Sequence, residues 1–531
     1  MTPPSDVQNP GAVEKRDGFG QLDWEYIENE DDNMLVKLEY PRLKREFLEY
    51  LQSHTDVIER IVAQHVRLLP GQHCIVAPPS DWLCGSFNAC LPIHVSGPRA
   101  HRLLIKCPLP YRLGGVTKPR LLDEKVRSEA ATFVWISQNC PRVPIPWLWG
   151  FGLPDGLAFT SVSRLPWYLR ALEYVKRGLA WILRKPFHRP FVPRRCPASL
   201  KCGYLLMDFI DKNQGTMLSS KWPLRADATD QKQNLYRDLS RLMLNLAHPL
   251  CKIGSFTVHN DGEVRLSQRP LTLQLAVLEN QGVPTEISPK TCYSRSDPYF
   301  HDLLRCHDLK LLHQPNSVRS KRDAEGQMAV LTIMRSLTAA FTQRDLQHGP
   351  FIFRLTDLHP SNIFVDGQCN IKAVVDLEWS CSLPIETQHP PFWLSGHELD
   401  EMEGENVADF DRTCNEFLDI FEQEDRFGVR DSPLEPGLCT TVMRASLEKK
   451  MHWYWSSLNE PRGMYNLFMD NIQPMFAPSH SERGQATRFQ QTIAPYWCTA
   501  SSAFIEDKVR DLQDYREQLR AKRREYSGLC P

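Results

Sequence analysis

One segment constrains the fold of this chain more than any other. It reads FIFRLTDLHPSNIFVDGQCNIKAVVDLEWS and runs from Phe351 to Ser380. Three short apolar runs are separated by a polar loop and a turn, a pattern that is typical of β-strands. The last two runs, Ile363–Val365 and Ile371–Val375, lie on either side of Asp366-Gly367 and predict a hairpin.

Three polar side chains stand where these strands begin and end. Asp357 and Asn362 precede the hairpin and Asp376 follows it, so the hairpin brings them near one another. Two carboxylates and an amide in one place suit Mg²⁺, which prefers oxygen ligands and keeps phosphate oxygens as further ligands. In phosphoryl transfer one Asp orients the attacking hydroxyl, while an Asn and a second Asp hold the metal. The alternative is an unrelated hairpin that carries these residues for structural reasons.

The same residues resemble the catalytic loop and metal-binding motif of the aminoglycoside phosphotransferase and choline kinase-like family. The family pattern is D-x-x-x-x-N followed by I-D-x-E, and Asp376 follows Asp357 by 19 positions (376 − 357). The resemblance implies that Asp357 is the catalytic base or orients the hydroxyl. It also implies that Asn362 and Asp376 bind Mg²⁺ and that ATP is the phosphoryl donor. Many relatives have His two residues before the catalytic Asp, where this chain has Leu355.

A lysine upstream is the candidate phosphate-binding cation. The run Leu103-Leu104-Ile105-Lys106 ends an apolar strand with lysine, as in the V-A-I-K pattern of kinases. We expect Lys106 to contact the α- and β-phosphates and Glu129, on the following helix, to hold its ammonium. Glu124 is the second candidate for that partner, and a surface lysine without a function is the simpler alternative.

Two further segments are candidates for nucleotide contacts. Gly85 and Ser86 belong to a turn whose backbone N–H groups could approach phosphate; an ordinary hairpin turn is the alternative. The strand KCGYLLMDFI resembles the hinge between lobes. There Asp208 and Ile210 would offer backbone groups to adenine and Met207 would line its pocket; a buried strand without that role fits the same letters.

The order of the predicted elements indicates an α+β chain, with strands in the first half and mainly helices after them. The family resemblance implies a bilobal, protein-kinase-like fold, with a small β-rich N-terminal lobe and a larger, mainly helical C-terminal lobe. We expect a disordered leader at 1–35, a helical segment at 36–70, an N-lobe at 71–210 with a basic insertion at about 161–201, a C-lobe at 211–480 with the catalytic loop at 351–380, and a helical extension at 481–531. Apolar periodicity predicts helices near 40–69, 123–139, 234–250, 327–341, 406–427 and 505–526, and strands near 73–76, 90–95, 101–107 and 201–210.

Composition excludes several classes of protein. Of 531 residues, 42% are hydrophobic and 24% charged, which excludes wholesale disorder. A net charge of −1 argues against a strongly basic nucleic-acid binder. No apolar stretch is long enough for a membrane span, and the N-terminus lacks the layout of a secretory signal. The 16 cysteines form no C-x-x-C pair, so we expect reduced thiols and a cytoplasmic location.

The insertion at 161–201 departs from this balance. It carries ten Lys or Arg against one acid, Glu173, a net charge of +9 (10 − 1), and several aromatic and aliphatic residues. It could form a basic amphipathic helix that meets an acidic lipid surface or an acidic partner. The interpretation we favour is a surface insertion that packs its aromatic side chains on its own domain.

The leading hypothesis is therefore an ATP- and Mg²⁺-dependent phosphotransferase that acts on a hydroxyl of a small molecule. The alternative is a catalytically inactive kinase-like binding module, which Leu355 favours. A protein kinase is less favoured, because G-x-G-x-x-G, D-F-G and A-P-E segments are lacking. An acidic face around Glu398–Asp425 could attract cationic acceptors. The acceptor's identity and the oligomeric state are not predicted.

Overall fold

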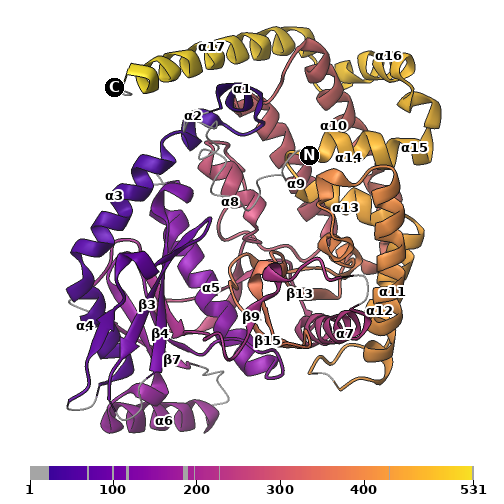
Figure 1. The fold of residues 1–531 in the computed structure, drawn as a ribbon. Coiled ribbons are helices and arrows are strands. Elements are labelled where there is room, and N and C mark those ends of the chain that lie inside the picture. The colour runs from indigo at the N-terminus through magenta and orange to yellow at the C-terminus, as the bar shows by residue number, and fades with distance from the viewer. Residues whose placement is uncertain are drawn as a thin grey trace.

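The computed structural model describes residues 23–68, 71–97, 101–114, 119–182, 189–195, 198–225, 228–429 and 431–528. They form a mixed structure of helices and antiparallel strands (Figure 1). The α-helices are α1 (Trp24–Asn29), α2 (Met34–Lys37), α3 (Tyr40–Ser53), α4 (Thr55–Val66), α5 (Pro119–Asn139), α6 (Trp167–Ile182), α7 (Thr229–Leu246), α8 (Leu273–Asn280), α9 (Ser296–His313), α10 (Lys321–Phe341), α11 (Glu405–Phe427), α12 (Leu438–Glu448), α13 (Met451–Asn459), α14 (Met464–Leu467), α15 (Gln473–Phe476), α16 (Arg483–Ile493) and α17 (Ser501–Gly528). The strands are β1 (Cys74–Val76), β2 (Leu83–Cys84), β3 (Asn88–Val95), β4 (His101–Pro108), β5 (Leu148–Gly152), β6 (Leu157–Ser161), β7 (Phe191–Arg195), β8 (Tyr204–Asp208), β9 (Thr216–Met217), β10 (Pro249–Leu250), β11 (Ser255–Val258), β12 (Val264–Gln268), β13 (Phe351–Leu355), β14 (Ile363–Val365), β15 (Ile371–Val374) and β16 (Ser380–Pro384).

The first part of the chain is built on one antiparallel sheet with the strand order β1-β3-β4-β8-β5-β6-β7 and with β2 paired to β3. Successive side chains of a strand point to opposite faces. On β4, Leu103 and Ile105 are therefore buried in the core that includes residues of α3 and α4, while Leu104 packs on the core that includes α5. Lys106 shares the face of Leu104, so the alternation of β4 directs this lysine toward α5.

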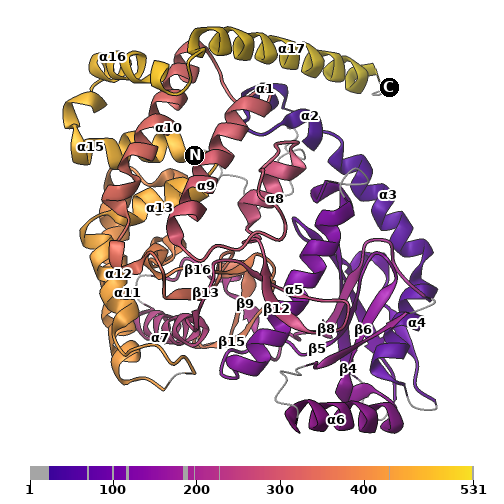
Figure 2. The same ribbon diagram turned by 180° about the vertical axis from the view of Figure 1, so that it is seen from behind.

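The later part of the chain is mainly helical and surrounds three small sheets (Figure 2). Strand β13 is the centre of the sheet β10-β13-β16, and β14 is the centre of the sheet β15-β14-β9. Helices α9, α10, α11 and α13 contribute to one core in which Phe300, Met328, Phe410 and Trp455 are buried. Strand β13 packs against this core through Phe351, which is one of its buried residues.

The N-terminal residues differ from the expected leader. Residues 1–22 lie outside the described part of the chain, but 24–29 and 34–37 form helices that pack on α17 from the other end of the sequence. Ile27, Met34 and Leu38 are buried there against Leu512 and Tyr515. The few apolar residues of this segment are too sparse to predict a helix, and their burial depends on a partner far away in the chain.

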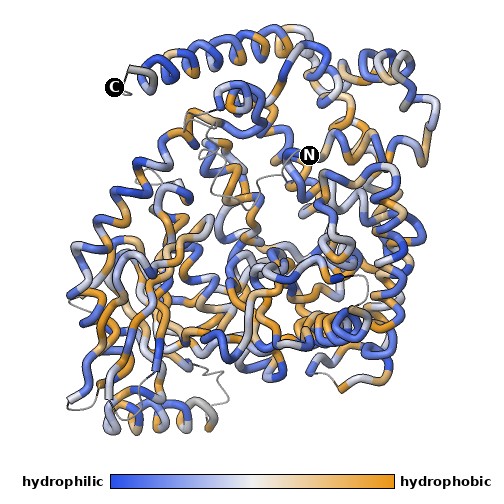
Figure 3. The backbone as a smooth tube through the Cα atoms, in the orientation of Figure 1, coloured by the Kyte–Doolittle hydropathy of each residue, from blue (hydrophilic) through white to orange (hydrophobic). Residues whose placement is uncertain are grey.

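The basic insertion also differs from the favoured interpretation. The described aromatic side chains of helix α6 are not buried against the rest of the protein: Trp167 is 70% exposed, and Tyr168 and Tyr174 are each 57% exposed. The helix lies at the edge of the molecule beside the large sheet (Figure 3). Residues 183–188 and 196–197 of the insertion lie outside the described residues.

No helix among the described residues is both long enough and apolar enough to cross a membrane.

Candidate active site

The hairpin β14–β15 places the two halves of the motif together. Asn362 comes directly before β14, and Asp376 comes two positions after the end of β15. Ile363 pairs with Val374, and the N–H of Val375 donates to the carbonyl oxygen of Asn362 at 2.9 Å. Antiparallel pairing therefore brings Asp376 back to the start of the hairpin.

The loop before the hairpin is held by its own hydrogen bonds. The side-chain amide of Asn362 donates to the carbonyl oxygen of Asp357 at 2.9 Å. The backbone N–H of Asn362 donates to the carbonyl oxygen of His359 at 2.9 Å, and the ring of His359 accepts from the N–H of Ser361 at 3.2 Å. These bonds fix Asp357 and Asn362 relative to each other.

The backbone of Asp376 has a conformation that is unusual for a residue other than glycine. Its φ is 60° and that of Trp379 is 52°, in the left-handed region that non-glycine residues rarely adopt. Such conformations cost about 1–3 kcal/mol each and concentrate at functional sites. The buried ring of Trp379 packs edge-on against Phe87 with centroids 5.2 Å apart, which links this segment to the turn after β2.

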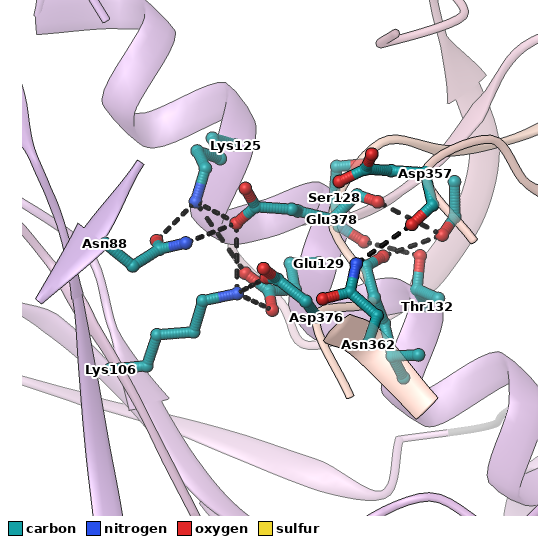
Figure 4. A network of polar contacts seen from close by, with 12 residues as sticks. Asn88, Lys106, Lys125, Ser128, Glu129, Thr132, Asp357, Asn362, Asp376 and Glu378 are labelled. Carbon is teal, nitrogen blue, oxygen red and sulfur yellow. Dashed lines mark hydrogen bonds and ion pairs between the residues drawn. The ribbon is translucent and has the colours of Figure 1, made fainter. Parts of the chain in front are cut away.

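Lys106 is the centre of a buried ion cluster (Figure 4). Its Nζ lies 2.6 Å from Glu129 Oε1 on α5 and 3.0 Å from Glu378 Oε2, and it also pairs with Asp376. Its side chain is 5% exposed. Burial disfavours the charged ammonium, but Asp376, Glu129 and Glu378 outweigh this and raise the pKa of Lys106 well above its usual value.

The cluster contains three residues that were not among the predicted site residues. Lys125 pairs with Glu378 and donates to Asn88 Oδ1 at 2.7 Å. The amide of Asn88 in turn donates to Glu378 Oε2 at 2.8 Å. Two signals were available in the sequence, because Glu378 closes the I-D-x-E pattern and Lys125 lies one helical turn before Glu129. Asn88 carried no comparable signal.

Carboxyl groups outnumber ammonium groups at this site. Asp357, Glu129, Asp376 and Glu378 lie near the ammonium groups of Lys106 and Lys125, an excess of two acidic groups (4 − 2). Burial, followed by repulsion from Asp376 and Glu378, raises the pKa of Asp357 well above its usual value. A buried excess of carboxylates is an environment that a bound cation stabilises.

The donor set fits a hard divalent cation. Glu129, Asp376 and Glu378 each have a carboxylate oxygen within 4.8 Å of the others. Glu129 Oε2 is buried and has no hydrogen-bond partner. Oxygen ligands from a few carboxylates, completed by phosphate oxygens, are what Mg²⁺ prefers.

A cavity of about 470 Å³ opens beside this cluster. It is lined by Asp357 and His359 from the loop and by Ser86 and Phe87 from the turn after β2, but not by Lys106. Burial lowers the pKa of His359 to about 4, so this ring is neutral at pH 7. The cavity therefore connects the motif with one of the predicted nucleotide segments.

Of the two glutamates predicted as partners of Lys106, only Glu129 contacts it in the structure. Glu129 contacts it directly, whereas Glu124 pairs with Arg269 at 2.9 Å, away from Lys106. The two glutamates lie five positions apart on α5, which is not a whole number of turns, so they point to different sides.

The remaining predicted residues lie around this centre. Ser86 lines the cavity and Gly85 closes the turn, its N–H donating to the carbonyl oxygen of Asn88 at 2.9 Å. Met207 pairs with Leu104 and Leu148 within the sheet. The N–H of Asp208 donates to the carbonyl oxygen of Trp147 at 3.0 Å, and Ile210 follows the strand. Met207, Asp208 and Ile210 do not line the 470 Å³ cavity.

No family model and no curated protein matches this sequence. Among solved structures, an ethanolamine kinase from Plasmodium vivax is 11% identical, with a TM-score of 0.33 over 82% of this chain and 88% of that one. A macrolide 2'-phosphotransferase type I is 9% identical, with a TM-score of 0.33 over 83% and 97% of the two chains. A macrolide 2'-phosphotransferase from Brachybacterium faecium is 10% identical, with a TM-score of 0.27 over 83% and 98%.

Proposed function

We propose that this protein is an ATP- and Mg²⁺-dependent phosphotransferase that transfers the γ-phosphoryl group to a hydroxyl of a small molecule. One observation carries the proposal. Lys106 and Glu129, from the sheet and α5, meet Asp376 of the motif in one buried cluster, although Lys106 and Asp376 are 270 positions apart in the sequence. Proteins rarely bury charged side chains, and groups with strongly shifted pKa values concentrate at functional sites.

The proposal includes a bilobal, protein-kinase-like arrangement. Residues 71–210 would form the N-lobe and 211–480 the C-lobe, with 481–531 as a C-terminal extension. The antiparallel sheet with α5 supports the first assignment, and the helices around β13 and β14 support the second. The cluster then lies where residues of both parts meet, as a site between two lobes requires.

Each of the site residues would have a separate role in binding the metal and the nucleotide. Bound Mg²⁺ would neutralise the phosphates, and Asn362 and Asp376 are the residues that would hold it, with Glu378 as a further oxygen ligand. Lys106, positioned by Glu129, would bind the α- and β-phosphates. Ser86 would cover the phosphates from the turn after β2, and Gly85 would let the backbone approach. Met207, Asp208 and Ile210 remain the predicted adenine contacts.

Asp357 would orient the acceptor hydroxyl and accept its proton. It borders the cavity, and its backbone carbonyl is held by Asn362. A raised pKa makes this carboxylate a stronger base than an exposed aspartate, which suits proton transfer near neutral pH.

A second candidate function is a kinase-like module that binds ligands without catalysis. Leu355 favours it, because an apolar side chain packed against the core cannot brace the loop by a hydrogen bond as His does in relatives. The hydrogen bonds that Asn362 and His359 make within the loop supply a different brace and support the catalytic proposal.

The test is a transfer assay with γ-labelled ATP, Mg²⁺ and a panel of hydroxyl-bearing metabolites. We expect labelled product with the native chain and about 10²- to 10⁴-fold less with Asp357→Asn, whereas Glu416→Gln, on the exposed face of α11, should match the native chain. Mg-ATP binding without transfer to any acceptor would favour the binding module.

A cytoplasmic location stays a prediction. It is supported by the thiols, because the cysteines among the described residues form no disulfide.

A further inference from the structure

Arg354 is a cation without a counterion in the wall of the cavity. It lies on β13, three positions before Asp357, and both residues line the 470 Å³ space. Its Nη1 donates to the carbonyl oxygen and the hydroxyl of Thr387 at 3.0 and 2.9 Å. Within the described residues no carboxylate lies within ion-pair distance of its guanidinium, and its other nitrogens have no hydrogen-bond partner.

Three other cations of the cavity wall have a carboxylate nearby, whereas Arg112 lies over the rings of Tyr40 and Phe87, 4.3 and 6.0 Å from their centroids. Lys37 and Arg462 both pair with Asp32. Lys310 donates to the carbonyl oxygen of Pro461 at 2.8 Å and has Asp32 among the carboxylates that act on its pKa. Arg354 has none, because the ionisable groups that act on it besides burial are the thiol of Cys381 and the phenol of Tyr299.

The surroundings of Arg354 are polar but carry no negative charge. Burial lowers the pKa of the neighbouring His389 to about 4, so this ring is neutral. The hydroxyl of Tyr299 and the side-chain oxygen of Gln388 are buried without hydrogen-bond partners, and both residues line the cavity. A partly buried guanidinium beside unsatisfied polar atoms is costly unless an anion completes it.

The face expected to attract cationic acceptors is a poorer candidate. Asp425 is buried and accepts hydrogen bonds from the N–H and hydroxyl of Thr440 at 3.0 and 2.9 Å, so it does not face a ligand. Glu398 borders the cavity, but its carboxylate caps the turn at Leu399–Glu401. Arg354 is the charged residue of β13 and, like Asp357, it lines the cavity.

We propose that the acceptor is a hydroxycarboxylic acid whose carboxylate binds Arg354 while its hydroxyl faces Asp357. The planar guanidinium matches a carboxylate through two parallel hydrogen bonds, which fixes the direction of the acceptor. This inference rests on the proposed phosphotransferase function. The acceptor oxygen forms a bond to the γ-phosphorus, the bond from that phosphorus to the bridging oxygen of ADP breaks, and the hydroxyl proton passes to the carboxylate of Asp357.

The test compares acids with matched amides, which differ only in the charge that Arg354 would bind. The probes are glycolate and 4-(hydroxymethyl)benzoate against glycolamide and 4-(hydroxymethyl)benzamide, in the presence of Mg-ATP. We expect the acids to raise the melting temperature more than the amides, and any transfer to favour the acid at least tenfold in kcat/KM. Arg354→Met keeps the apolar stem and should abolish the preference through KM, while Arg354→Lys should keep part of it.

The possible results distinguish a failure of the carboxylate proposal from a failure of the proposed phosphotransferase function. Mg-ATP binding with no preference for acids over amides in either readout overturns the carboxylate proposal, as does an unchanged preference in Arg354→Met. If the native chain does not bind Mg-ATP, the proposed phosphotransferase function is contradicted. Calorimetry with Mg-ATP should give equal affinities for Arg354→Met and the native chain, which shows that the variant is folded.

A second and independent observation concerns α6. Seven large apolar side chains of this helix are between 48% and 70% exposed: Trp167, Tyr168, Leu172, Tyr174, Val175, Leu179 and Ile182. At 100° per residue they occupy one broad arc, whereas the residues turned toward the protein are Leu169 and the buried Glu173. The arrangement is the reverse of an ordinary surface helix, which buries its apolar stripe.

Basic side chains flank this arc. Arg170 and Arg177 on α6 and Arg194 and Arg195 on the nearby strand β7 are exposed and have no ion-pair partner among the described residues. A helix with an exposed apolar arc that includes Trp and Tyr, bordered by Arg, is typical of helices that lie in the interface of a bilayer. Arginine side chains near an anionic lipid surface are attracted to it.

We infer that α6 docks this protein on a membrane surface that contains anionic lipids. The positive charge around the helix matches such a surface, and the apolar arc would enter the headgroup region without crossing the bilayer.

The test is co-sedimentation of the full chain with vesicles of phosphatidylcholine alone and with added phosphatidylserine. We expect binding only with phosphatidylserine, weakened by salt, and at least tenfold weaker for the double variants Leu172→Glu/Leu179→Glu and Arg170→Glu/Arg177→Glu. Phe427→Glu, which changes an exposed residue at the end of α11, should bind as the native chain does. No binding to either vesicle, or equal binding by all variants, overturns the inference.

Discussion

At the scale of single residues, the site depends on a buried cluster of carboxyl and ammonium groups in which the carboxyl groups are in excess. Lys106 contacts three carboxylates, so we expect the removal of any one of them to change its position and its electrostatic environment. Glu129 is the carboxylate that contacts this ammonium from α5, and its side chain is buried.

Glu129→Gln should lower kcat/KM about 10²-fold, since a small displacement of a positioning group has an effect of that order. The amide keeps the size of the side chain but removes the charge that holds Lys106. The matched control is Glu124→Gln on the same helix, which weakens the contact with Arg269 and should lower the melting temperature while kcat/KM stays within about threefold. Equal activity losses in both variants would contradict the assignment of Glu129.

Asp357→Asn should lower the rate of phosphoryl transfer about 10²- to 10⁴-fold while Mg-ATP still binds, because general base catalysis contributes a factor of about that size. The carboxamide cannot accept the hydroxyl proton, but it preserves the shape of the loop. Steady-state kinetics together with calorimetry would check this split, and a loss of nucleotide binding equal to the loss of rate would contradict it.

At the scale of elements, the sequence predicted segments with strong local signals and missed those that depend on distant partners. The helices near 123–139, 327–341 and 406–427 appear as α5, α10 and α11, because their apolar periodicity is regular. The helix expected to reach Leu250 ends at Leu246, because Pro249 and Leu250 pair with β13 instead. Strand pairing between distant segments leaves no periodic signal in the sequence.

The contact between α2 and α17 gives an element-scale prediction. The backbone N–H of Met34 donates to the hydroxyl of Tyr515 at 2.9 Å in a buried cluster. Tyr515→Phe leaves this N–H without a partner and should lower the free energy of unfolding by about 1–3 kcal/mol. Tyr496→Phe, at a side chain that is 78% exposed, is the control and should change it by less than about 0.5 kcal/mol. Equal unfolding free energies for both variants in denaturant titrations would contradict the buried contact.

At the scale of the whole molecule, the motif predicted which residues meet, but not how far their network extends. Asp357 and Asn362 precede the β14–β15 hairpin and Asp376 follows it, so their spacing in the sequence was sufficient to predict that they lie close together. Asn88 and Lys125 join the cluster only through the packing of the large sheet against α5, and Arg354 is an ordinary strand residue in the sequence. Their roles depend on tertiary contacts that one sequence does not display.

Buried histidines give a prediction for the whole chain. His65 and His307 are buried and neutral, and burial lowers the pKa of each to about 4, against 6.5 in the unfolded chain. The unfolded state therefore binds more protons between pH 6.5 and 4, so the stability that these rings contribute is complete above pH 6.5 and is lost as the pH falls toward 4. At pH 5 the loss is about 1–2 kcal/mol for each ring.

Thermal melts at pH 7.5 and pH 5.0 measure this effect. The melting temperature should fall at pH 5.0, and His307→Gln, which retains a donor for the carbonyl oxygen of Leu458, should show a smaller fall than the native chain. The same difference between the two pH values in both proteins would contradict a neutral, buried His307.

Calorimetric titration of Mg-ATP into the native chain and Asp376→Ala probes the buried carboxylate cluster most directly. The native chain should bind, Asp376→Ala and Asp376→Asn should bind at least tenfold more weakly, and Glu416→Gln should match the native chain, with circular dichroism showing that all are folded. Equal affinity in the native chain and both Asp376 variants would contradict a metal–nucleotide site at this hairpin.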